Sequence, residues 1–172
     1  SDRYWFLFWY RQWDKLTVTA TRSHPEWIGM TFREIGEKLG KDPFQIVYDL
    51  LADEGEGMDQ VWLNGVLFSE GDIIEWITDP LFSIAADGFT SKDSGPLAKV
   101  TNHPNSYGWT PRVVQMYVRE LRAMSLETAI RKMTSMPAAR FGLYDRGILR
   151  AGMQADIAVF DEASFKTRAT YL

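Results

Sequence analysis

The sequence predicts an α/β fold in which short strands alternate with helices. Helix signals and β-rich runs follow one another in the order strand, helix, strand, helix, strand, long loop, helix. The strand candidates are mostly apolar, which is typical of parallel strands that are covered on both faces. With 172 residues, 45% of them hydrophobic, the chain can bury the core of one globular domain or of one large piece of a bigger one.

Capping residues mark where the helices of the first half begin and end. Thr31 and Glu34 have the spacing of a capping box, and Gly40 stops that helix. Asp42 in the N-cap position and Pro43 in the first helical position start the next helix. The elements predicted in this half are a strand at 15–21, helices within 30–40 and 41–57, a strand at 60–68 and a helix that opens at 69.

The second half predicts one more strand, then helices, then a hairpin. The apolar run Leu81–Ala86 has the length of a buried strand. Thr110 with Pro111 predicts the start of a helix within 111–124, and Ser125 predicts the start of another within 125–135. Glycines punctuate residues 146–161, where we expect two short strands.

Asp87 follows the last apolar position of the predicted strand Leu81–Ala86. In a barrel or an open sheet of parallel strands, the loops at the carboxyl ends of the strands build the functional site. A carboxylate placed there can take a proton, bind a cation, or do both. An aspartate followed by glycine can also simply make a turn with its own side-chain oxygens, and the residues alone leave both interpretations open.

Charge and cysteine content exclude several classes of protein. The formal net charge is -4, and Lys and Arg are scattered among Asp and Glu rather than gathered in runs, so no nucleic-acid partner is expected. The absence of cysteine excludes disulfides, thiolate nucleophiles and cysteine-ligated zinc. It also favours a cytoplasmic location.

An unbroken apolar and aromatic run, Tyr4–Tyr10, lies near the start of the chain. The run is too short to span a bilayer, and no basic region or small-residue cleavage site flanks it, so no membrane association is expected. We interpret it as a buried packing segment, with a pocket wall or a surface for a partner chain as the alternatives.

A series of short motifs follows Ala86 and carries a family resemblance. The motifs are Asp-Gly at 87–88, His-Pro at 103–104, Tyr-Gly at 107–108, Pro-Arg-Val at 111–113, Ser-Leu-Glu at 125–127, Pro-Ala at 137–138, Gly-Leu at 142–143 and "GILRAGMQADIAVFD" at 147–161. With them the chain, from about Trp13 to Ala169, resembles the C-terminal part of the N-acyl-D-amino-acid deacylases (D-aminoacylases) of the amidohydrolase superfamily.

The resemblance implies a more specific architecture than the pattern alone. Residues 1–142 would form the last βα units of a (β/α)8 barrel, and residues 143–172 would form part of a small β-sandwich. Both would be completed by another chain or by a missing N-terminal segment.

The resemblance also implies roles for individual residues. Asp87 would be the general base that takes a proton from the attacking water and returns it to the leaving amine, and it is a possible metal ligand. His103 and Tyr107 would bind substrate, although either can serve only to shape the loop. Asn105 stands where the family commonly has Arg, which removes a charged fork for a substrate carboxylate.

The family's zinc chemistry needs histidines that this chain lacks. The family uses one or two zinc ions, and a mononuclear catalytic zinc takes three protein ligands. This chain has only His24 and His103, with no His-x-His. We therefore expect most zinc ligands to come from the N-terminal barrel portion, a separate chain or segment. Ser1 would then be a cleavage-generated N-terminus, if both derive from one precursor, or equally an artificial end.

Two functions remain open on the sequence. The first is a C-terminal subunit or fragment of a metal-dependent amidohydrolase that cleaves an N-acyl (D-)amino acid or a similar peptide-like amide. The second is a non-catalytic structural or binding subunit derived from such an enzyme.

Overall fold

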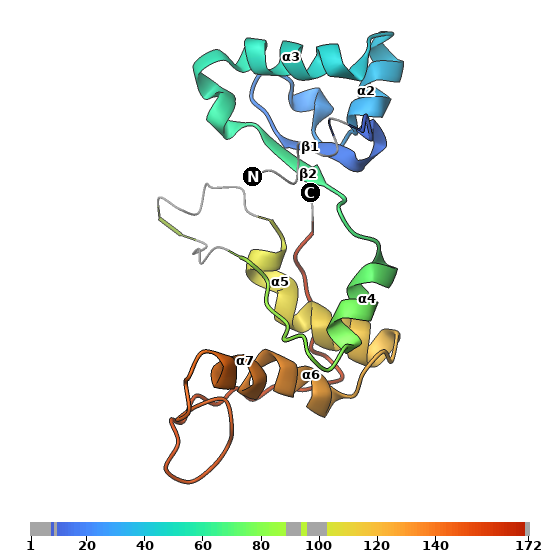
Figure 1. Cartoon of the computed structure of the whole chain (residues 1–172). Coiled ribbons are helices and arrows are strands. Elements are labelled where there is room, and N and C mark those ends of the chain that lie inside the picture. Colours follow the sequence, from blue (N-terminus) through green and yellow to red (C-terminus); the bar gives the residue numbers. More distant parts are fainter. Residues whose placement is uncertain (1–7, 9, 89–93, 96–102, 171–172) are drawn as a thin grey trace. The chain divides into compact units, whose positions relative to one another are not determined.

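The computed structural model describes residues 8, 10–88, 94–95 and 103–170, and Figure 1 shows the chain. Most of the run Tyr4–Tyr10, and most of the loop that follows Asp87, lie outside the described residues. The described residues form two units: residues up to 69, with 94–95 and 103, make the first, and residues 70–88 with 104–170 make the second. The domain boundary at residue 142 stays a prediction.

A two-stranded antiparallel sheet lies at the centre of the first unit. Strand β1 (Leu16–Ala20) pairs with β2 (Trp62–Gly65), with Leu16 opposite Gly65 and an irregularity after Val18. Both strands were predicted and both are confirmed, but the expectation of parallel strands is wrong for this pair. The connection between them contains helices α2 (Phe32–Leu39) and α3 (Pro43–Glu54), and the pairing shows that the two strands run in opposite directions.

Helices α2 (Phe32–Leu39) and α3 (Pro43–Glu54) begin where the capping residues predicted. The Thr31 hydroxyl accepts the amide proton of Glu34 at 3.2 Å, and the Glu34 carboxylate accepts that of Thr31 at 2.7 Å. Gly40 ends α2 in the left-handed region, with φ of 64°. These caps satisfy backbone groups that the helix itself leaves open.

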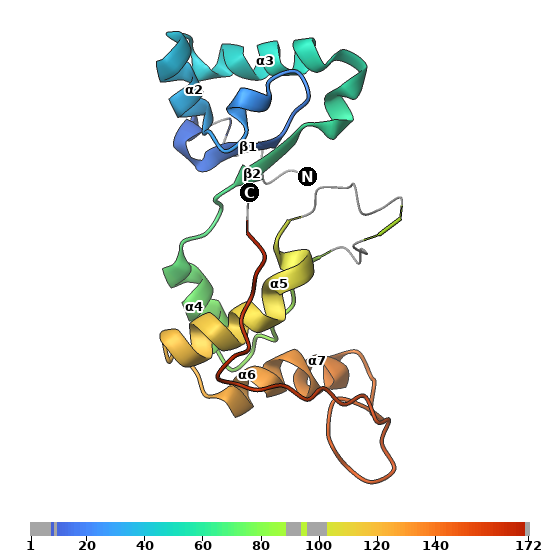
Figure 2. The same ribbon diagram turned by 180° about the vertical axis from the view of Figure 1, so that it is seen from behind.

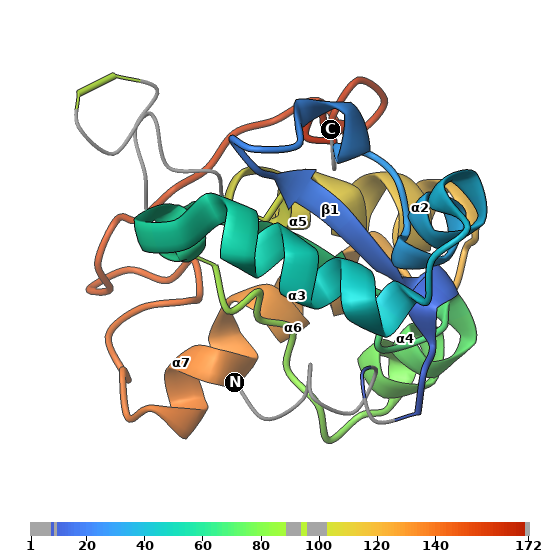
Figure 3. The same ribbon diagram turned by 90° about the horizontal axis from the view of Figure 1, so that it is seen from above.

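The core of the first unit lies between the sheet and the two helices. Phe32, Ile35, Ile46 and Leu50 of the helices pack on Leu16 and Val18 of β1, together with Trp13 and Trp27. Figure 1 and the view from above in Figure 3 both place α3 over β1. Three short 3₁₀ helices complete this unit: η1 (Trp13–Lys15), η2 (Pro25–Trp27) and η3 (Gly55–Gln60).

The second unit is helical. It contains α4 (Glu70–Thr78), α5 (Asn105–Arg112), the π-helix η5 (Val113–Glu120), α6 (Leu126–Met133) and α7 (Ser135–Arg140). Its core is built by Ile84, Val113, Tyr117, Val118 and Ala129. The segment 162–169 runs along α5 and η5, where Arg119 donates to the carbonyl of Phe165 at 3.0 Å (Figure 2).

Helix α5 begins earlier than the sequence indicated. We expected a start at Thr110 and Pro111, but the helix opens at Asn105 and Pro111 lies inside it. A proline has no amide proton for the helical ladder. The chain then continues as a π-helix, which ends with the amide of Leu121 bonded to the carbonyl of Met116 at 2.8 Å.

Two predicted strand regions contain no strand in the part of the chain that the structure describes. Residues 82–88 and 143–170 have no ladder partner, and a strand needs one. The mixed α/β class is confirmed, but the predicted strand 81–86 and the strands of 146–161 are wrong for this structure. The region 145–156 is instead closed by a hydrogen bond of 2.8 Å from the Gln154 amide to the Asp145 carbonyl and by an ion pair of 2.9 Å between Arg146 and Asp156.

Among the described helices, none is long and apolar enough to cross a membrane. The barrel and the sandwich stay predictions, because the described sheet has only two strands.

Candidate functional site

Asp87 lies at the end of the irregular segment 82–88, and its side chain is exposed. Its φ of 46° is in the left-handed region, which Asp tolerates better than most residues. Within the described part of the chain, no hydrogen bond or ion pair engages its carboxylate. The oxygens are therefore not used to make the turn, which was the alternative interpretation of an Asp-Gly pair.

The first turn of α5 holds the Asp87 turn from one side. The side-chain amide of Asn105 donates a hydrogen bond to the carbonyl of Ala86. Gly88 lies close to the same turn, because a Cβ added to it would be 3.0 Å from the Cα of Ser106. Asn105 was considered only as a departure from the family pattern, and its role in holding the Asp87 turn had no sequence signal.

The segment before Asp87 is held from α6 and α7. Lys132 donates to the carbonyls of Asp79 and Phe82, and Arg140 donates to the carbonyl of Leu81. The amide of Ile84 donates to the carbonyl of Lys132 at 3.0 Å. The backbone of this segment is thus hydrogen-bonded to side chains of α6 and α7 and to one backbone carbonyl of α6, rather than to a neighbouring strand.

The other two predicted site residues are less closely tied to Asp87. Tyr107 is 54% exposed and lies in the turn of α5 that carries Asn105. His103 is exposed and belongs to the first unit. A role of either residue in substrate binding stays a prediction.

His24 has a structural environment in the first unit. Its ring stacks on Trp27 at a centroid distance of 3.7 Å, and its two nitrogens lie 2.8 Å from Asp53 and 3.2 Å from Glu26. Partial burial opposes protonation, but hydrogen bonds that the Asp53 and Glu26 carboxylates accept, together with their negative charge, outweigh it and raise the pKa of His24. The ring therefore ties η2 to the end of α3.

Glu54 is a buried carboxylate that the sequence analysis did not single out. Its Oε1 accepts the amide protons of Ser23 at 2.9 Å and Arg22 at 2.6 Å, and hydroxyl protons of Thr21 at 2.5 Å and Ser23 at 2.9 Å. The backbone amide of Ser23, followed by the Thr21 hydroxyl, lowers the pKa of Glu54 to about 2. These four hydrogen bonds fix residues 21–23.

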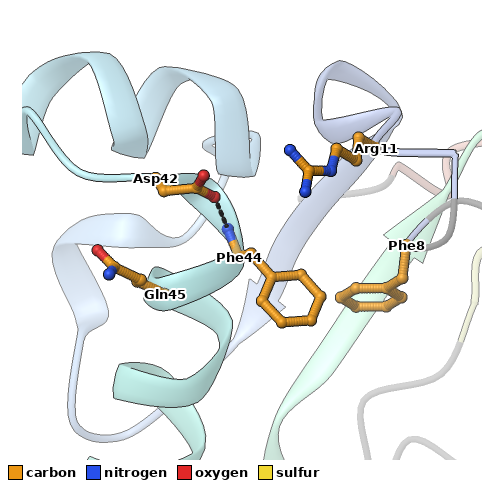
Figure 4. Close-up of a pocket in the computed structure, with 5 residues that line it drawn as sticks. All are labelled: Phe8, Arg11, Asp42, Phe44 and Gln45. Carbon is orange, nitrogen blue, oxygen red and sulfur yellow. Dashed lines mark hydrogen bonds between the residues drawn. The ribbon is translucent and has the colours of Figure 1, made fainter.

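A pocket of about 370 Å3 opens on the first unit, lined by Phe8, Arg11, Asp42, Phe44 and Gln45 (Figure 4). The Asp42 carboxylate is engaged in capping α3 through the Phe44 amide at 2.8 Å. None of the predicted site residues lines this pocket.

Over the described ranges, no three residues of the types His, Cys, Asp and Glu lie close enough together to hold a metal ion. These residues do not fit a catalytic metal centre. An exposed carboxylate such as that of Asp87 is chemically able to accept a proton.

Comparison with known proteins identifies the class. The amidohydrolase family (Amidohydro_3) matches residues 12–172, and the chain belongs to this family. The N-acyl-D-aspartate deacylase of Alcaligenes xylosoxydans xylosoxydans is 34% identical over 154 residues, which are 90% of this chain and 28% of that protein. The N-acyl-D-glutamate deacylase of the same organism is 32% identical over 162 residues, which are 93% of this chain and 30% of that protein.

Solved structures agree with this assignment. A crystal structure of D-aminoacylase matches with a TM-score of 0.70 and 30% identity, over 91% of this chain and 30% of that one. The N-acyl-D-glutamate deacylase of Bordetella bronchiseptica, complexed with zinc and a phosphonate mimic of the tetrahedral intermediate, matches with a TM-score of 0.66 and 29% identity, again over 91% and 30%. The chain thus spans about 30% of the length of these relatives.

Proposed function

We propose that this chain is the C-terminal part, as a subunit or fragment, of a metal-dependent amidohydrolase that cleaves the amide bond of an N-acyl-D-amino acid or a similar peptide-like amide. The family assignment and the deacylase relatives support the class of reaction. One structural observation carries the proposal for this chain. The carboxylate of Asp87 is exposed and not engaged by described residues, while the backbone around it is held by Asn105.

Asp87 would act as the general base and then as the general acid. Its carboxylate takes a proton from the water that attacks the amide carbonyl carbon. The same proton then passes to the leaving nitrogen as the C–N bond breaks, which gives an amino acid and a carboxylic acid. An ionised carboxylate can accept a proton at either oxygen, and positioned proton transfer of this kind contributes about 10²–10⁴-fold to a rate.

The proposal requires a partner. The metal, one or two zinc ions in this proposal, would be held mostly by the N-terminal barrel portion of the enzyme, because this sequence has two histidines and no cysteine. His103 and Tyr107 would contribute to the substrate pocket. Exposed apolar side chains such as Phe141, Ile157 and Val159, which are 82%, 62% and 94% exposed, offer surface for that partner.

Native mass spectrometry of the purified protein, followed by metal analysis of each component and a deacylation assay, tests this proposal. We expect a second polypeptide that carries the zinc, and hydrolysis of N-acetyl-D-glutamate or N-acetyl-D-aspartate by the assembly. A lone chain that binds no zinc and hydrolyses neither compound would contradict a catalytic subunit and leave a fragment or a non-catalytic derivative.

A non-catalytic structural or binding subunit derived from such an enzyme is the second candidate. The two candidates differ in what they require of Asp87. In a non-catalytic subunit, Asp87→Asn leaves the activity of the assembly unchanged.

A further inference from the structure

Lys132 is the one charged side chain among the largest fully buried side chains of the described residues, with 1% of its surface exposed. It lies in the last turn of α6. Burial lowers the pKa of its ammonium group, and the neighbouring Arg131 and Arg140 act in the same direction, although Asp79 opposes them. Burying a cation costs free energy unless the cation is paired and hydrogen-bonded. The hydrogen-bond partners of Lys132 therefore explain how the protein accommodates it.

The partners of Lys132 all lie on one short segment. Its Nζ donates to the carbonyls of Asp79 and of Phe82, the latter at 2.8 Å. Its own carbonyl accepts the amide proton of Ile84 at 3.0 Å. Lys132 therefore binds three backbone groups within residues 79–84: two carbonyl acceptors and one amide donor.

These three hydrogen bonds hold residues 79–84 against α6. Ile84 is 9% exposed and packs in the core of the second unit. Asp87 follows three residues later, and Asn105 holds the carbonyl of Ala86 from α5. Because residues 82–88 have no strand partner among the described residues, their position depends on these side-chain donors.

We propose that Lys132 is a positioning residue for the reaction: it clamps the backbone of residues 79–84 and thereby sets where the Asp87 carboxylate stands. This inference rests on the proposed function only in taking Asp87 as the proton carrier. The clamp itself is a property of the chain.

The test compares Lys132→Met, which keeps the length of the side chain and removes its donors, with Lys132→Arg, which keeps the charge and the donors. Lys166→Met is the control, because Lys166 is exposed. Amide hydrogen exchange of each 172-residue variant is measured residue by residue. We expect exchange at Ile84, Ala86 and Asp87 to accelerate on the order of tenfold in Lys132→Met, with little change at Ala129 inside α6.

Lys132→Arg should restore slow exchange at these positions, and Lys166→Met should match the unmodified chain. A uniform acceleration across the second unit, Ala129 included, would overturn the inference, because Lys132 would then serve general stability. If Lys132→Met does not fold, Lys132→Gln, whose shorter amide cannot reach both carbonyls, must show the same local pattern, and its failure to do so overturns the inference equally.

Turnover in the assembly separates this inference from the proposed function. We expect Lys132→Met to lower kcat on the order of tenfold with KM little changed, and to have little further effect when added to Asp87→Asn, because both act through one carboxylate. Local acceleration of exchange with full activity would overturn the positioning role. Full activity of Asp87→Asn alone would overturn the proposed function and leave the clamp on residues 79–84 intact.

Discussion

The side-chain amide of Asn105 donates a hydrogen bond to the carbonyl of Ala86, so α5 holds the peptide that immediately precedes Asp87. Ala86 and Asn105 are separated by a loop whose residues lie mostly outside the described structure. The hydrogen bond therefore joins the residue before the loop, Ala86, to the residue after it, Asn105.

Asn105→Leu removes this donor at nearly constant volume. We expect the free energy of unfolding to fall by about 1 kcal/mol, the usual net contribution of one hydrogen bond. Asn105→Asp should cost more, because it brings a negative oxygen toward the carbonyl of Ala86. Denaturant unfolding measures both changes. Equal stability of all three proteins would show that the bond does not hold the turn.

Glu54 predicts how the first unit responds to acid. Its pKa is lowered from 4.5 to about 2, so the unfolded chain binds a proton at a pH where the folded chain does not. The ionised Glu54 carboxylate contributes fully to the stability of the folded state above pH 4.5, the pKa of the unfolded chain. This contribution is lost as the pH falls toward 2.

Glu54→Gln should remove this acid-dependent part of the stability. We expect a thermal midpoint several degrees lower at neutral pH, and a difference from the unmodified chain that shrinks as the pH is lowered. Thermal unfolding followed by circular dichroism over that range checks the trend. Glu37→Gln, an exposed position on α2, is the matched control; an equal effect of the two substitutions would contradict the role of Glu54.

Two glycines with the same backbone conformation differ in their surroundings. Gly147 and Gly152 have φ of 82° and 85°. A Cβ on Gly147 would lie 3.0 Å from Ala138 Cβ and 3.0 Å from Ser135 Cα, whereas a Cβ on Gly152 would meet nothing within 4 Å.

Alanine at these positions separates backbone strain from steric conflict. We expect Gly152→Ala to lower the free energy of unfolding by about 1–2 kcal/mol, the cost of the left-handed region. Gly147→Ala should cost roughly 1–3 kcal/mol more, because it also overpacks the contact with α7. Chemical denaturation of both variants measures the difference, and equal losses would mean that the contact with α7 is absent.

Local signals could be predicted from the sequence because they depend on neighbours along the chain. The capping residues Thr31, Asp42 and Ser125 each start the helix that they were expected to start. The positions of β1 and β2 also followed from apolar and β-branched runs.

Features that depend on partners distant in the sequence could not be predicted in this way. The direction of β2 depends on its pairing with β1, more than 40 residues earlier in the chain, and an apolar run such as Leu81–Ala86 becomes a strand only beside another strand. Likewise, the pattern placed Asp87 at the end of a strand that the described structure does not contain. The bonds that hold the backbone before it come from Asn105 and Lys132, on helices far along the chain.

The proposed role of Asp87 in turnover is tested most directly by Asp87→Asn in the proposed zinc-loaded assembly. Asp59→Asn, at an exposed aspartate of η3, is the control. Deacylation of an N-acetyl-D-amino acid is measured together with the mass and zinc content of each assembly. We expect kcat of Asp87→Asn to fall by at least about 100-fold, with the mass and zinc content unchanged, because a positioned proton carrier contributes that much or more. An Asp87→Asn assembly that turns over as fast as the Asp59→Asn control would show that Asp87 does not carry the proton.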